Sequence, residues 1–242
     1  MTSSHNASDT QTRTLRPKDA ATLIVLRRMR DGYRVLMGRR HSGQAFMPGK
    51  FVFPGGRVDA ADSRITPASD LRESEMQRLM LEMRGRPTPN RVRALALAAV
   101  RETFEETGLA IGTADGTPRT SRSAAWQAFY RTGVRPALSP LHYIARAITP
   151  PGRPRRFDAR FFVVEEEHVA HGLDDEISPG TDELLDLRWF AFDEARAADL
   201  PRVTREVIGH LERILAQPGG LAGHYPVPFW FTRRGRWIRL EL

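Results

Sequence analysis

The stretch Arg101–Gly108, RETFEETG, places three glutamates close together and ends on a glycine, directly after the apolar run ALALAAV at 94–100. On a helix, at about 100° per residue, Glu102, Glu105 and Glu106 fall within an arc of roughly 100°. The turns before them are apolar nearly all round. This pattern predicts a largely buried helix that brings three carboxylates together at its C-terminal end.

Signals for both ends of this helix flank the apolar run. Asn90, which follows Pro89, is a good N-cap residue, and Gly108 is a good residue for the left-handed conformation that closes a helix. The sequence therefore predicts one helix that starts at Asn90 and ends just before Gly108.

Two interpretations of the acidic cluster follow from the residues. The ordinary interpretation is an exposed helix end. An Arg101–Glu105 pair at i, i+4 would stabilise it by roughly 0.2–0.5 kcal/mol. The buried helix favours the other, because converging carboxylates repel one another and lose hydration, and one arginine cannot offset both costs. A bound cation is then expected. Oxygen ligands without sulfur suit Mg²⁺ or Mn²⁺ rather than zinc, with phosphate oxygens completing the coordination.

A glycine pair lies upstream of the helix. FPGGRVD, residues 53–59, places Gly55 and Gly56 after a short apolar run. Glycine adopts backbone angles closed to other residues and lets the main chain approach a ligand closely. A Gly-Gly pair alone is usually only a turn, and its position before the glutamates is what suggests a site.

The remaining elements are predicted from periodicity and turn residues. Apolar runs at 21–29 and 33–40 flank Asp31-Gly32, a strong hairpin signal. Helices are expected at 68–85, 123–133 and 202–216, further strands at 142–150, 156–167 and around 184–192, and a last hairpin turning near Gly235.

The chain reads as one folded unit. Residues 1–16 are polar and rich in Ser and Thr, so a flexible tail is expected there. Neither a repeat nor a low-complexity linker divides the rest. The sequence therefore predicts a single domain over 17–242.

Composition limits the class of protein. Cysteine is absent, which excludes disulfides, thiolate zinc sites and cysteine nucleophiles and suits a reducing compartment, so the expected location is cytoplasmic. No apolar run reaches the roughly 20 residues of a membrane helix. The formal charge is +8, but 35 of the 37 cationic residues are arginines spread along the chain. That spread makes nucleic-acid binding the less favoured interpretation and leaves phosphate-bearing small molecules.

With these motifs in place, the sequence resembles the Nudix hydrolase family. The second half of the family signature is Arg-Glu-aliphatic-x-Glu-Glu-x-Gly-aliphatic, and the chain matches it with Arg101, Glu102, Glu105, Glu106, Gly108 and Leu109, with Thr103 at the first aliphatic position.

The first half of the signature departs from the family. Five residues after Gly56 stands Asp62, where the family has glutamate. From Asp62 to Arg101 there are 101 − 62 − 1 = 38 residues, where the family has seven. This interrupted signature resembles the branch that includes peroxisomal coenzyme A diphosphatases. The insertion, about 63–90, is expected either to lean over the substrate or to bulge outward.

The resemblance implies fold and chemistry. The expected fold is an α/β/α sandwich with a mixed β-sheet and a helical insertion inside the signature. The implied reaction is Mg²⁺- or Mn²⁺-dependent hydrolysis of a nucleoside diphosphate linked to another group. The metal ligands implied by matched position are Gly56, Glu102, Glu105 and Glu106.

Other roles are implied in the same way. Arg101 is expected to orient Glu105, and Asp62 is expected to stand in for the missing glutamate. The general base stays open between Glu102, Glu106 and an acid of the later loop. Glu183 is the preferred loop candidate, and the alternatives are Asp174, Asp175 and Glu176.

Substrate contacts are the least determined part. Gly55 and four arginines are the expected phosphate-binding residues: Arg39, Arg40, Arg155 and Arg156. The coenzyme A signature of other family members is matched at Arg40 and Gly49, but Ala45 stands where it has arginine.

Coenzyme A or acyl-coenzyme A is therefore the leading substrate, followed by ADP-ribose, NADH and related dinucleotides. A non-catalytic ligand-binding module is the main alternative, and an RNA-binding or decapping protein is a third. The family resemblance also implies a homodimer.

Overall fold

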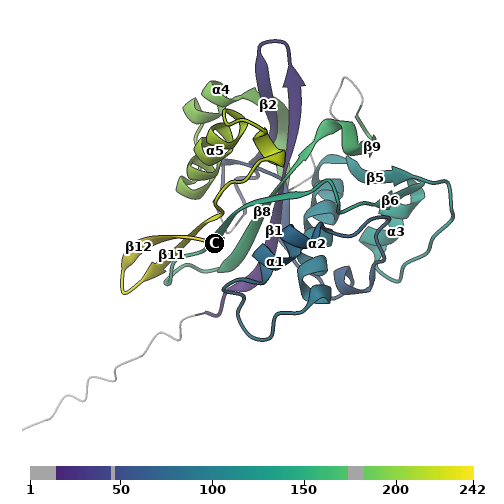
Figure 1. The fold of residues 1–242 in the computed structure, drawn as a ribbon, viewed down its shortest axis with the longest axis horizontal. Helices are drawn as coiled ribbons and strands as arrows, with labels where there is room; N and C mark the ends of the chain where they lie inside the picture. The colour runs from purple at the N-terminus through teal and green to yellow at the C-terminus, as the bar shows by residue number, and fades with distance from the viewer. Residues whose placement is uncertain (1–14, 45–46, 174–182) are drawn as a thin grey trace, which may run out of the picture.

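The computed structural model describes residues 15–44, 47–173 and 183–242 (Figure 1). The strands are β1 (Lys18–Met29), β2 (Gly32–Arg40), β3 (Phe51–Val52), β4 (Gly55–Arg57), β5 (Ala110–Ala114), β6 (Val134–Pro136), β7 (His142–Ile148), β8 (Phe157–Glu165), β9 (Val169–His171), β10 (Leu184–Ala191), β11 (Pro228–Arg233) and β12 (Arg236–Glu241). The α-helices are α1 (Glu73–Met80), α2 (Pro89–Thr107), α3 (Ala124–Arg131), α4 (Phe192–Ala197) and α5 (Arg202–Leu215). Short 3₁₀ turns are η1 (Asp62–Arg64), η2 (Glu166–His168) and η3 (Gly220–Ala222).

One large mixed sheet organises the molecule. Its strand order is β10-β2-β1-β8-β7-β11-β12, with β3 paired to β2 and β4 paired to β1. The pairs β1–β8 and β7–β11 are parallel, and the other pairs in this sheet are antiparallel. Strands β6, β5 and β9 form a separate small sheet. The predicted hairpins β1–β2 and β11–β12 are both present.

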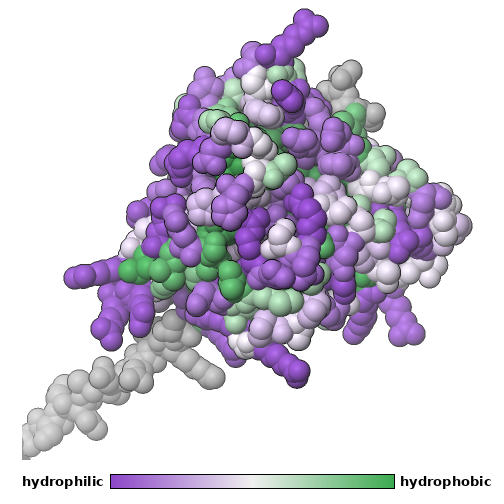
Figure 2. Space-filling view, viewed as in Figure 1, coloured by the Kyte–Doolittle hydropathy of each residue, from purple (hydrophilic) through white to green (hydrophobic). Residues whose placement is uncertain are grey.

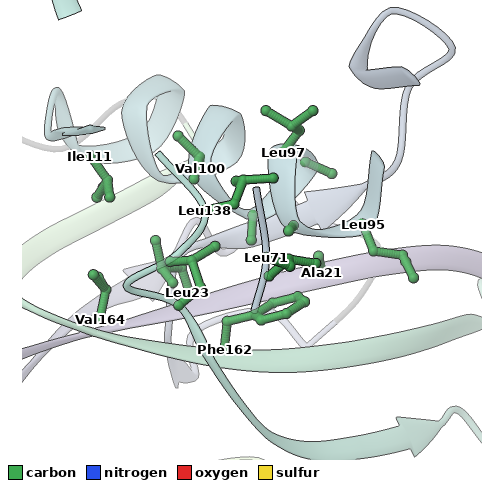
Figure 3. Close-up of a cluster of buried hydrophobic side chains, with 14 of the residues drawn as sticks. Ala21, Leu23, Leu71, Leu95, Leu97, Val100, Ile111, Leu138, Phe162 and Val164 are labelled. Atoms are coloured by element: carbon green, nitrogen blue, oxygen red, sulfur yellow. The ribbon is translucent and has the colours of Figure 1, made fainter. Parts of the chain in front are cut away.

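Helices cover both faces of the large sheet, with α1, α2 and α3 on one side and α4 and α5 on the other (Figure 1). Side chains along β1 point alternately to the two faces of the sheet and so contribute to both apolar layers. Leu23 packs with α2 and Ile24 packs with α5. Figure 3 shows the α2 layer, where Leu95 and Val100 of the helix lie above Phe162 of the sheet. The predicted α/β/α sandwich with a mixed sheet is confirmed.

Helix α2 is buried along most of its length, as its apolar pattern predicts. Its end at Thr107 is confirmed, with Gly108 in the left-handed region at φ 76°. The predicted start of the helix is wrong, because Thr88 is the N-cap and accepts a hydrogen bond from Arg91 N at 3.3 Å. Pro89 occupies the first helical position, where its fixed φ favours the helix and its missing N–H is not needed. The helix therefore begins before the predicted Asn90.

The insertion forms part of the core. Helix α1 is shorter than the predicted 68–85, because the chain before it is irregular and its Ala68 N donates to Pro136 O at 2.7 Å rather than within a helix. Leu71, Leu79 and Met83 are buried against α2. The insertion is therefore neither a separate lid nor an outward bulge, because its apolar side chains form part of the layer that packs against α2.

The surface has both hydrophilic and apolar regions. Figure 2 shows hydrophilic side chains over most of the viewed face and apolar ones gathered around the β11–β12 hairpin, where Leu240 is 42% exposed. In the described part of the chain, no helix is both long enough and apolar enough to cross a membrane.

Candidate active site

The glycine pair and the C-terminal end of α2 are in direct contact. Gly55 N donates a hydrogen bond to Glu106 Oε2 at 2.8 Å. A Cβ atom at Gly56 would lie 2.4 Å from the Cδ and Oε2 atoms of Glu102, so the carboxylate of Glu102 would have to move. A Cβ at Gly55 would lie 2.5 Å from the carbonyl oxygen of Ala21, which is main chain and cannot move away in the same way. Gly55 is therefore required by close approach of two main-chain segments, and the predicted meeting of the two motifs is present.

Arg101 fixes the orientation of two of the glutamates. Its Nη1 atom donates to Glu102 Oε1 at 2.8 Å and to Glu105 Oε2 at 2.6 Å. The rest of its fork points to Asp62 and to the carbonyl oxygen of Arg57, 2.9 Å from Nη2. The side chain of Glu105 is 39% exposed and that of Glu102 is 17% exposed. The predicted pairing of Arg101 with Glu105 is present, and Arg101 holds Glu102 as well.

Asp62 lies beneath the site rather than in it. The residue is fully buried, and its carboxylate accepts from Arg101 Nε at 2.8 Å and from Arg101 Nη2 at 3.1 Å. It thus stands in for the missing glutamate as a partner of the arginine. Sequence reasoning missed a further donor to Asp62, Trp126 Nε1 at 2.8 Å, because 64 residues separate the two.

Burial disfavours ionised carboxylates at the end of α2. The pKa of Glu106 is raised to about 8, chiefly by burial and also by the charges of Glu102 and Glu183, against the opposing Gly55 N–H and the charge of Arg40. Burial also raises the pKa of Glu102, although the charge of Arg101 opposes this. The fold therefore compensates Glu102 only in part, through Arg101, and leaves Glu106 without a cationic partner in hydrogen-bond contact among the described residues.

These residues fit a hard divalent cation. Carboxylate oxygens and a glycine carbonyl are the donors that Mg²⁺ and Mn²⁺ prefer, and a cation would supply the positive charge that Glu106 lacks. Glu102, Glu106 and the carbonyl of Gly56 would hold it, with Glu105 adjacent. Within the described ranges, no three His, Asp or Glu side chains are already gathered as a ligand set.

Two further predicted residues lie near Glu106. Arg40 and Glu183 both act on its pKa through their charges. The Arg40 Nε atom is buried and has no hydrogen-bond acceptor among the described residues. Glu183 is placed by its carbonyl oxygen, which accepts from His41 N at 3.2 Å. The alternatives Asp174, Asp175 and Glu176, and the position of Ala45, lie outside the described residues.

Arg39 is not brought to the glutamates. Arg39 Nε donates to Asp186 Oδ2 at 2.7 Å, and both side chains are about half exposed. Neighbouring strand residues point to opposite faces of a sheet, so Arg39 and Arg40 cannot share one site. The expectation that Arg39 binds phosphate at this centre is therefore corrected.

Arg155 and Arg156 also lie away from the glycine pair. They precede Phe157, which pairs with Lys18 at the start of β1, whereas Gly55 pairs with Thr22. Four residues of strand correspond to about 13 Å. Arg156 donates to the carbonyl oxygens of Thr149 and Leu15, and Arg155 is exposed. The structure does not place this pair beside the glutamates.

The comparisons with known proteins agree with this geometry. The chain is similar to the crystal structure of a Nudix hydrolase from Alicyclobacillus acidocaldarius, with a TM-score of 0.59 and 27% identity over 80% of this chain and 90% of that one. It is also 34% identical over 116 residues to the acyl-coenzyme A diphosphatase NUDT19 of Gallus gallus. That match covers 38% of this chain and 29% of the relative's length. No protein-family model matches the sequence.

Proposed function

Because the chain belongs to the Nudix hydrolase family, we propose that it is a divalent-metal-dependent hydrolase of nucleoside diphosphate derivatives, with coenzyme A or acyl-coenzyme A as its substrate. The observation that carries the proposal is the convergence of Glu102 and Glu106 on Gly55 and Gly56, with Arg101 holding Glu102 and Glu105. A buried carboxylate with a raised pKa in such a position is typical of a site that takes a ligand.

In the proposed reaction, water attacks one phosphorus of the diphosphate and the bridging P–O bond breaks. The bridging oxygen leaves with the second phosphate, and the water gives up a proton. When bound, Mg²⁺ or Mn²⁺ would polarise the diphosphate and lower the pKa of the attacking water. For coenzyme A the products are 4′-phosphopantetheine and adenosine 3′,5′-bisphosphate.

The chain's own residues would bind and orient in this scheme. Arg101 keeps two glutamates in fixed positions, and the glycine pair lets the main chain approach the phosphates. Arg40, whose buried Nε has no acceptor within the described ranges, is the arginine that would contact a phosphate oxygen. Our candidate for the base that receives the water's proton is Glu183. It lies near enough to Glu106 for its charge to raise the pKa of that carboxyl.

Two arguments support the coenzyme A assignment. The curated relative is an acyl-coenzyme A diphosphatase, and its match reaches 34% identity over part of both chains. Arg40 also fits the coenzyme A signature. Hydrolysis of ADP-ribose or NADH is the second candidate, because the glutamates, the glycine pair and Arg40 would contact only the diphosphate, which these substrates share with coenzyme A. A ligand-binding module without turnover is disfavoured because all three glutamates are present.

A hydrolysis panel tests the proposal. Purified protein with Mg²⁺ or Mn²⁺ would be given coenzyme A, acyl-coenzyme A, ADP-ribose, NADH and capped RNA, beside Glu105→Gln as the matched control. We expect release of 4′-phosphopantetheine and a loss of at least 100-fold in the variant. Activity on ADP-ribose or NADH alone would contradict the assignment of coenzyme A as the substrate. Metal binding without any turnover would favour a ligand-binding module that does not hydrolyse its ligand.

A further inference from the structure

A chain of hydrogen bonds connects helix α3, which lies outside the family signature, to the glutamates of α2. Trp126, on α3, is fully buried and donates its indole N–H to Asp62 Oδ1 at 2.8 Å. The same oxygen accepts from Arg101 Nε at 2.8 Å. The other carboxylate oxygen, Oδ2, accepts from Asp59 N at 2.8 Å and from Arg101 Nη2 at 3.1 Å. Asp62 therefore has two donors on each oxygen, which fixes the rotation of its carboxylate.

Arg101 has no freedom left once Asp62 is fixed. A guanidinium group has five N–H donors in a rigid plane. In this structure they meet five acceptors: both oxygens of Asp62, the carbonyl oxygen of Arg57, Glu102 Oε1 and Glu105 Oε2. A rotation of the Asp62 carboxylate would turn the whole fork and carry Glu102 and Glu105 with it.

The indole is suited to this place for two reasons. It is a neutral donor, so it stabilises the Asp62 carboxylate without competing with the charge of Arg101. Its ring is also held firmly, because Phe129 packs at 5.3 Å between ring centroids and itself packs on Phe104 of α2 at 5.2 Å. The N–H thus points from a rigid aromatic cluster, and Asp62 has a fixed partner even though it is one carbon shorter than glutamate.

We propose that Trp126 is a positioning residue of the active site, acting through Asp62 and Arg101 on the glutamates that would hold the divalent cation. The inference rests on the proposed function only in assuming that these glutamates bind metal, and not on any substrate. Partners of metal ligands of this kind typically change metal affinity or activity by 10- to 100-fold when they are lost.

The test is the variant Trp126→Phe, which removes the indole N–H and keeps most of the ring packing. Calorimetric titration with Mn²⁺ in the absence of substrate is expected to show binding about tenfold weaker than in the wild-type protein. Turnover, where it is measured, is expected to fall through kcat with KM unchanged. Wild-type Mn²⁺ affinity in a folded Trp126→Phe protein would overturn the proposal.

Phe129→Leu is the matched control. Phe129 is fully buried in the same cluster and donates no hydrogen bond, so this variant perturbs packing alone. It is expected to lower the melting temperature and to leave Mn²⁺ affinity within twofold. A loss of Mn²⁺ affinity equal to that of Trp126→Phe would overturn the proposal, because packing rather than the N–H would then be responsible.

A measurement on the wild-type protein decides the question even if Trp126→Phe does not fold. With tryptophans labelled by ¹⁵N, the four indole N–H signals can be assigned by replacing each of Trp189, Trp230 and Trp237 with phenylalanine. The Trp126 signal is expected to shift on titration with Mg²⁺. The Mg²⁺ concentration at the midpoint of this shift should equal that at the midpoint of metal binding. A signal unmoved at saturating Mg²⁺ would overturn the proposal. Metal binding without hydrolysis would instead contradict the proposed function and leave this inference intact.

Discussion

Two buried carboxylates in this protein have opposite surroundings. Asp158, on β8, is 1% exposed and receives two bonds of 2.8 Å from Arg146, with Arg160 at 3.1 Å. Glu106, on α2, is 6% exposed and, among the residues that the structure describes, receives one side-chain bond, from Gly55 N. Burial alone would raise the pKa of both groups. The arginines bring that of Asp158 below its ordinary value, whereas that of Glu106 stays raised.

We infer that the difference separates a carboxylate that stabilises the fold from one that would bind a ligand. Where a carboxylate only holds the fold together, its partners come from the chain and are complete. Arg146, for example, also donates to the carbonyl oxygen of Glu82 at 2.9 Å and so ties the insertion to the sheet. Where the chain leaves a buried carboxylate uncompensated next to a glycine pair, the missing charge is expected from a ligand.

The largest expected effect comes from breaking the structural network. Arg146→Met removes the main partner of Asp158, together with the cation–π contact on Phe229, and leaves Asp158 with Arg160 alone among these two arginines. Because a buried charge is left without its main partner, we expect the free energy of unfolding to fall by about 3–5 kcal/mol. Urea denaturation measures this change. A loss below about 1 kcal/mol would show that Asp158 is not held as described.

The second prediction concerns the pH dependence of the metal-free protein. The folded-state pKa of Glu106, about 8, lies above its ordinary value of 4.5, so the folded state binds the proton more tightly. The resulting stability is fully present below pH 4.5 and is lost as the pH rises through 8. Urea titrations in EDTA at pH 6 and pH 9 measure it.

Glu106→Gln is the matched variant for that experiment. Glutamine has no titrating group, so the Glu106 part of the pH dependence is expected to disappear. The wild-type protein with saturating Mg²⁺ should also lose it, because the cation favours the ionised carboxylate. An unchanged pH profile in Glu106→Gln would assign the dependence to other groups.

The smallest effect is expected at the neighbouring arginines of β2. Arg39→Gln removes an exposed pair with Asp186 and should change the free energy of unfolding by less than about 1 kcal/mol. Its kcat/KM should stay within twofold of the wild-type value, whereas Arg40→Gln should lower kcat/KM about tenfold or more. Steady-state kinetics on both variants compares them directly. Equal losses would contradict the assignment of the two side chains to different faces.

The sequence predicted most of the fold and the contacts around Arg101 and the glycine pair because their signals are local. Helix α2 follows from periodicity and Gly108, and the pairing of Arg101 with Glu105 follows from their spacing of four residues. Thr88 was missed as the N-cap because Asn90 is an equally good capping residue by type. Arg39 could have been separated from Arg40 by the alternation of a strand.

Other features depend on contacts that spacing does not encode. Trp126 and Asp62 are 64 residues apart, and the apolar positions of the insertion fit a lid as well as a core layer. Only the folded chain shows that Leu79 is 1% exposed against α2. The placement of Arg155 and Arg156 likewise depends on how β8 is aligned with β1.

We propose that a divalent cation binds beside the glycine pair, where Glu106 lacks a cationic partner. Calorimetric titration of the wild-type protein and of Glu106→Gln with Mn²⁺, without substrate and at one pH, tests this proposal. We expect saturable binding to the wild-type protein that becomes at least tenfold weaker in the variant. Equal Mn²⁺ affinity in both proteins, or no binding to the wild-type protein, would contradict it.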